Sequence, residues 1–173
     1  MRPTFLHATL LAVFALAAAG CATIQANITE TAKWQAMADR VTDGHVTVVL
    51  TAGRTGIYLR LSRTVELGMA NSEEGKQWLL AHELGHYILG HVGAELRQEM
   101  EANASAVRSL QAWGRSERDA VALVESILLR IQRNGSTLTG KGHDWCAEYH
   151  DIASRYPQYP APAGAGVCGV AMR

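Results

Sequence analysis

The pattern of apolar and polar positions divides the chain into a helical start, a β-rich segment and a long helical remainder. Residues 27–41 place apolar side chains on one helical face, and an Asp-Gly turn follows. Two β-rich runs, 45–53 and 55–62, are joined by turn residues typical of an antiparallel hairpin, and residues 63–69 can add a third short strand. The segment therefore predicts a small sheet of two or three antiparallel strands.

Helical periodicity resumes after the strands and continues almost to the end of the chain. Each helix begins with capping or acidic residues or ends at glycine or proline. The four predicted helices cover residues 72–91, 94–114, 117–133 and 144–156. One helix, a short antiparallel sheet and four further helices together predict an α+β fold.

Composition restricts the class of protein further. The 173 residues suffice for one domain with a hydrophobic core, and hydrophobic residues make up 48% of them. The 16 basic residues balance the 16 acidic ones, which argues against a nucleic-acid partner and against a polybasic membrane patch.

The first residues are typical of an export signal rather than of the fold. Residues 1–20 contain one basic residue, then an apolar run, then small residues before Cys21. The sequence Ala-Ala-Gly-Cys at 18–21 resembles a bacterial lipobox, in which Cys21 is lipidated, and Ala22 resembles the sorting residue of outer-membrane lipoproteins. Residues 21–27 then form a tether to the periplasmic face of the outer membrane. The alternative is an ordinary secretory signal with an unmodified Cys21.

Export also affects the two remaining cysteines. Cys146 and Cys168 are an even pair in an oxidising compartment, where a disulfide is the expected state. Such a bond would hold the Gly/Ala/Pro-rich tail, residues 158–173, to the last helix of a domain that spans 28–157. The alternative is two free thiols.

A zinc-binding pentapeptide, His-Glu-Leu-Gly-His, lies within the helix predicted at 72–91. His82 and His86 are four residues apart and so differ by about 40° around the helix axis, which lets both imidazoles reach one Zn²⁺ ion. Glu83 is rotated by about 100° from His82 and flanks the ion instead of binding it. That is the position of a general base that takes a proton from zinc-activated water.

A catalytic zinc needs a third protein ligand, and Glu95, Glu99 and Glu101 are the candidates downstream. If the two helices form an antiparallel pair, residues equally far from the turn lie level with one another. This places Glu99 beside His86, whereas Glu101 points elsewhere, so replacing Glu101 is expected to leave metal binding unchanged.

Two further side chains follow from the same helix pair. Asn103 lies one turn beyond Glu99, nearly level with His82, where its amide can accept the second N–H of that imidazole. His91 is about 140° around the helix from His86, so we expect it to interact with the helix C-terminus and not with the metal.

The segments "AHELGHYILGH" and "EMEAN" resemble the compact gluzincin metallopeptidases, of the ImmA/IrrE and HtpX types, over about residues 76–110. The resemblance implies a zincin-like fold in which an HExxH helix pairs with a Glu-bearing helix. It also implies His82, His86 and Glu99 as ligands, Glu83 as general base and Asn103 as their supporting residue. The gap between His86 and Glu99 is shorter than in that family.

A peptidase also needs a group that stabilises the oxyanion formed during hydrolysis, and His143, Tyr149 and His150 are equally available. The sequence thus predicts a zinc-dependent endopeptidase of the bacterial envelope that acts on a protein or peptide. The strand that ends near Met69 is expected to pair with an extended substrate. The alternative is a non-catalytic lipoprotein that zinc stabilises and that binds a protein partner.

Overall fold

The structure is a computed structural model of the chain. It describes residues 27–53, 55–93, 95–135 and 142–169. The predicted signal 1–20, Cys21 and most of the tether lie outside the described residues. Within the described part of the chain, no helix is both long enough and apolar enough to cross a membrane.

The elements follow one another in the predicted order, which confirms an α+β fold. A helix at residues 27–42 precedes the strands β1 (Thr47–Thr51), β2 (Gly56–Leu59) and β3 (Thr64–Gly68). The later helices are α2 (Glu73–Ile88), α3 (Leu96–Ala112), α4 (Glu117–Arg133) and α5 (Trp145–Arg155), and the short 3-10 helix η1 covers Ala165–Cys168.

The sheet is mixed, so the predicted antiparallel sheet and the hairpin between its first two strands are wrong. The strand order is β1-β3-β2, with β1 parallel and β2 antiparallel to β3. Alternation of apolar residues identifies strands but not their neighbours. β3 occupies the centre because Val65 and Leu67 are both fully buried, whereas Ile57 and Leu59 of β2 remain exposed.

This topology also overturns the expectation that the strand ending near Met69 pairs with a substrate. That strand is β3, and its two edges are occupied by β1 and β2. The free edge closest to the helices belongs to β2, which packs against α2.

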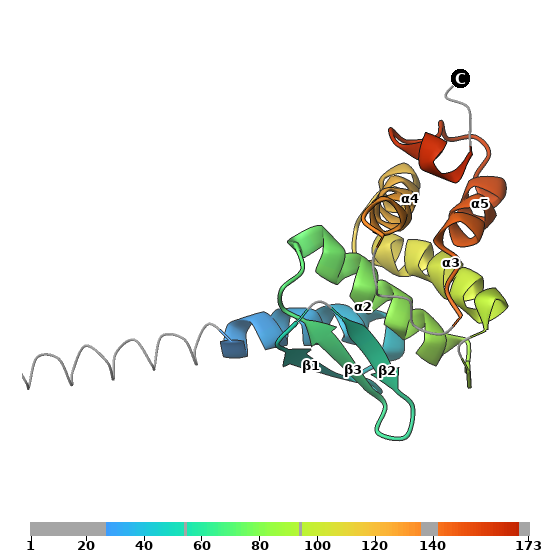
Figure 1. Ribbon diagram of the computed structural model, residues 1–173. Coiled ribbons are helices and arrows are strands. Elements are labelled where there is room, and N and C mark those ends of the chain that lie inside the picture. The colour runs from blue at the N-terminus through green and yellow to red at the C-terminus, as the bar shows by residue number, and fades with distance from the viewer. Residues whose placement is uncertain (1–26, 54, 94, 136–141, 170–173) are drawn as a thin grey trace, which may run out of the picture.

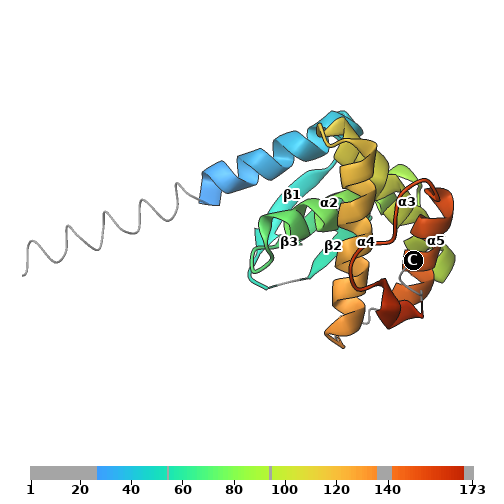
Figure 2. The ribbon, with the colours of Figure 1, turned by 90° about the horizontal axis from the view of Figure 1, so that it is seen from above.

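Helix α2 is the central element of the molecule. Figure 1 shows it between the sheet and the C-terminal helices, and Figure 2 shows α4 crossing over it. Every residue from 78 to 85 is buried, so this helix is enclosed on all sides instead of presenting one apolar face. Of the two histidines of the HExxH sequence, His82 therefore lies in the interior of the fold, and His86, one turn later, is half-buried.

α2 ends earlier than predicted, at Ile88 and not near His91. Gly90 adopts a φ of +67°, which favours glycine. The N–H of Gly90 donates to the carbonyl of Tyr87 (3.1 Å), and that of His91 donates to the carbonyl of His86 (3.0 Å). These two bonds form a Schellman motif, which turns the chain back and places His91 beside the last turn of the helix.

The tail is attached to α5 by a disulfide between Cys146 and Cys168, 22 residues apart in sequence. Replacing both cysteines by serine should lower the free energy of unfolding by about 3 kcal/mol, because the unfolded chain regains the entropy of an open loop. Urea unfolding measures this loss. A reductant should lower the free energy of unfolding of the wild type by a similar amount and leave that of the double variant unchanged. Equal stability of the wild type and the double variant without reductant would contradict the prediction.

Glu125 of α4 is only 4% exposed, and burial raises its pKa to about 7. Because the fold favours the neutral carboxyl, the associated stability is complete below pH 4.5 and is lost as the pH rises through about 7. Glu125→Gln should therefore melt at a higher temperature than the wild type at about pH 8, with the difference shrinking toward about pH 5. Thermal melts across this range test the prediction, and a pH-independent difference would refute it.

Candidate metal centre

The site is built on α2 and α3, which run in opposite directions. His86 of α2 lies against Glu99 of α3, whereas Gln77, nine residues earlier, accepts a hydrogen bond from Arg115 beyond the end of α3. Gly85 permits the close approach, since a Cβ atom there would lie 2.8 Å from the carbonyl oxygen of Ala102. The structure therefore has the antiparallel helix pair on which the choice of Glu99 depended.

Three side-chain donor atoms converge between these helices. Nε2 of His82 lies 3.1 Å from Oε2 of Glu99 and 3.2 Å from Nε2 of His86. The third edge, from Nε2 of His86 to Oε2 of Glu99, measures 3.3 Å. A tetrahedral zinc ion with bonds of about 2.0 Å keeps its ligands about 3.3 Å apart. The spacing of this nearly equilateral triangle thus fits one face of a zinc coordination tetrahedron.

Electrostatics also favour a cation at this position. Burial lowers the pKa of His82, but the hydrogen bond to Glu99 and the charges of Glu83 and Glu148 outweigh it and raise that pKa to about 9. Burial of Glu99 opposes its ionisation, yet the neighbouring imidazoles of His82 and His86 hold its pKa well below the ordinary value. Carboxylates thus surround the imidazole pair, and a positive charge between them is stabilised.

Asn103 holds His82 in one tautomer. Its Oδ1 lies 3.0 Å from Nδ1 of His82 and accepts a hydrogen bond from Nε1 of Trp78 (3.2 Å). Its Nδ2 donates to Glu148 at 2.7 Å, which fixes the orientation of the amide. His82 must therefore donate through Nδ1, which leaves Nε2, the nitrogen next to Glu99, as the atom that a metal could bind in place of its proton.

Glu83 lies on the side of α2 that faces a cleft of about 900 Å³. Its side chain is 9% exposed, and one carboxylate oxygen accepts a hydrogen bond from the backbone N–H of Tyr58 in β2 (2.9 Å). It is not one of the three converging donors, although it lines the cleft beside His82. The carboxylate thus borders the cleft next to one of the three donors.

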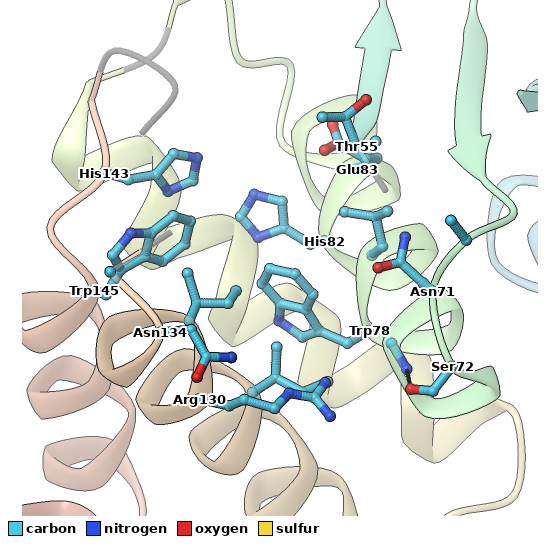
Figure 3. A pocket seen from close by; sticks show the side chains of 17 residues that line it. Thr55, Asn71, Ser72, Trp78, His82, Glu83, Arg130, Asn134, His143 and Trp145 are labelled. Carbon is cyan, nitrogen blue, oxygen red and sulfur yellow. Dashed lines mark hydrogen bonds between the residues drawn. The ribbon is translucent and has the colours of Figure 1, made fainter. Parts of the chain in front are cut away.

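The structure separates the three candidates for the oxyanion-stabilising group. Tyr149 is buried in the core, and His150 is exposed, with Nε2 3.1 Å from the carbonyl oxygen of Cys168. Only His143 lines the cleft, where Figure 3 shows it facing His82.

His143 is held in place from two sides. Its ring stacks on Trp145 with centroids 4.2 Å apart, and its Nδ1 lies 2.9 Å from a carboxylate oxygen of Glu148. Nε2 is 3.5 Å from Oε2 of Glu99. His143 nevertheless does not join the group of His82, His86 and Glu99, whose donor atoms all lie within 4.8 Å of one another. It therefore flanks the metal position.

Comparisons with known proteins give no identification. No family model, no curated protein and no solved structure matches the chain. Any functional conclusion therefore depends on the residues and their geometry.

Two features of the site were not predicted from the sequence. Glu148 is fully buried and connects Asn103 to His143. Its position on the same face of α5 as the apolar Trp145 and Ile152 was the available signal, because a carboxylate on a buried face needs a partner.

The second feature is a contact of His91, which was expected to interact only with the helix C-terminus. Its Nδ1 lies 3.0 Å from Nδ1 of His86, and its Nε2 lies 3.1 Å from a carboxylate oxygen of Glu101. Glu101 does face away from the metal position, but it is linked to His86 through His91. Gly90 was the available signal, because a glycine at this position favours a Schellman motif that folds the next residue back.

Proposed function

We propose that this protein is a zinc-dependent endopeptidase with a zincin-like domain. The observation that carries the proposal is the triangle of His82, His86 and Glu99, with edges of 3.1 to 3.3 Å, next to a cleft that His82 and Glu83 line. Two imidazoles and one carboxylate are a ligand set typical of catalytic zinc in peptidases.

The chain's own groups can carry out the proton transfers of peptide hydrolysis. A bound zinc ion would polarise the peptide carbonyl and increase the acidity of water. Glu83 accepts the proton of the attacking water and delivers it to the departing amine. His143, oriented by Glu148, faces the same space, and its imidazolium form, with Nδ1 donating to Glu148, can donate a hydrogen bond to the oxyanion through Nε2.

Three converging protein donors among the described residues favour a catalytic metal over a purely structural one. Structural zinc sites are usually closed by four protein ligands, whereas catalytic sites keep one position free. Among the described residues, the donors that group together are His82, His86 and Glu99. This count argues against the alternative of a non-catalytic, zinc-stabilised lipoprotein that only binds a partner.

β2 is the best candidate for contact with the peptide substrate. It is the edge strand next to α2, Tyr58 contacts Glu83, and the cleft is lined by Thr55 and Gly56 at the beginning of the strand. An extended peptide that adds to this edge would present its backbone to Glu83. We therefore place an unfolded protein or a peptide along β2.

We further propose that the enzyme acts in the bacterial envelope, anchored through Cys21 to the periplasmic face of the outer membrane. The signal-like residues 1–20 support export, and the bond between Cys146 and Cys168 is typical of an oxidising compartment.

Cleavage of casein by the purified mature domain tests the peptidase proposal. We expect new peptide N-termini to form in the presence of zinc, to be suppressed by a chelator and to return when zinc is restored. Casein and an unfolded-peptide library that stay intact while zinc is bound would instead favour the non-catalytic alternative.

A further inference from the structure

We propose that His91 and Glu101 form a hydrogen-bonded relay that fixes the orientation and tautomer of His86, so that its Nε2 binds the metal. The inference rests on the proposed metal site, and it assigns His91 and Glu101 as positioning residues. It begins from two contacts, His86 Nδ1 to His91 Nδ1 at 3.0 Å and His91 Nε2 to Glu101 Oε2 at 3.1 Å.

One arrangement of protons satisfies both contacts with neutral rings. The Glu101 carboxylate can only accept, so Nε2 of His91 carries the proton. Nδ1 of a neutral His91 is then an acceptor, and the facing Nδ1 of His86 must donate to it. A neutral His86 protonated at Nδ1 has a lone pair on Nε2, the atom that lies 3.2 Å from Nε2 of His82 and 3.3 Å from Glu99.

The fold holds both ends of this relay in place. The Schellman motif at Gly90 folds His91 back under the last turn of α2, where its side chain is only 6% exposed. Glu101 is fixed through its second oxygen, which accepts a hydrogen bond from Arg97 at 2.6 Å. The relay therefore extends from the metal position to the surface through α3.

Other roles for His91 do not fit this geometry. Its Nδ1 faces the non-metal nitrogen of His86, and its Nε2 faces Glu101, so neither nitrogen is directed at the triangle of donors. It also does not belong to the group of residues whose donor atoms converge. His91 thus does for His86 what Asn103 does for His82, with an imidazole and a carboxylate in place of an amide.

Zinc affinity, measured by competition with a chelating dye, is the first test. His91→Phe should weaken zinc binding by about 10- to 100-fold, the usual effect of removing a partner of a metal-binding histidine. Glu101→Ala should weaken it in the same direction, contrary to the expectation from helix geometry alone. Glu101→Gln should stay close to the wild type because its amide oxygen still accepts from His91, and the exposed His45→Phe serves as the control.

The nitrogen chemical shifts of His86 provide a readout that general destabilisation would not move. In the wild type, Nδ1 should carry the proton and Nε2 should respond to zinc, whereas His91→Phe should show a mixture of tautomers. Wild-type affinity in both His91→Phe and Glu101→Ala, or zinc bound through Nδ1 of His86, would overturn the relay. A wild type that binds no zinc would overturn the proposed function together with the relay. Wild-type zinc affinity in the two variants would overturn the relay alone, so the two failures can be told apart.

Discussion

Glutamine in place of Glu83 should reduce peptide hydrolysis by about a hundred- to ten-thousand-fold, while zinc remains bound. The amide oxygen of glutamine can still accept the hydrogen bond from Tyr58, so the local structure should persist. What the variant lacks is a group that accepts a proton from water at neutral pH. Initial rates on casein and zinc content, measured on the same preparation, give both halves of this result.

Glu74→Gln is a suitable control for this variant, because Glu74 is an exposed acid on the same helix. It should change neither the rate nor the zinc content. If Glu83→Gln is purified without zinc while Glu74→Gln retains it, Glu83 is a ligand and its role as a general base is incorrect.

Removal of Glu99 should abolish the metal site itself. Glu99→Ala leaves two imidazoles, which are too few protein ligands for a stable zinc site. At a zinc concentration of 100 times the dissociation constant, the wild type should gain about 2.7 kcal/mol of stability from binding, and this variant should gain none. Metal analysis after gel filtration, with thermal melts with and without zinc, measures both effects.

Glu95→Ala is the matched control, since Glu95 is the exposed residue that immediately precedes α3. It should bind zinc as the wild type does. A Glu99→Ala protein that still carries one zinc per chain would show that another group completes the site. The position of Glu99 beside His86 in the antiparallel pair of α2 and α3 would then no longer identify it as the third ligand.

The helices and the proximity of His82 to His86 could be predicted because their geometry is local. Four-residue spacing places His82 and His86 on one side of any helix, whatever surrounds it. Glu99 required one further step, an antiparallel helix pair, and the short turn between α2 and α3 made that pairing the simplest arrangement.

The sheet and the supporting residues could not be predicted because they depend on contacts between distant segments. Apolar alternation marks β3 as a strand but does not say that it lies between β1 and β2. Glu148 reaches Asn103 across 45 positions of sequence, and only the packing of α5 against α3 brings them together. His91 is close to His86 in sequence, yet its contact depends on the left-handed conformation of Gly90.

X-ray absorption at the zinc edge, on protein loaded with one equivalent of zinc, tests the central claim most directly. The account predicts four-coordinate zinc with two imidazole nitrogens and oxygen ligands, at distances of about 2.0 to 2.2 Å. The oxygens would come from Glu99 and from a water at the open position. A third imidazole in the coordination sphere would mean that His143 closes the site, and this result would contradict a catalytic centre, as would a protein that retains no zinc at all.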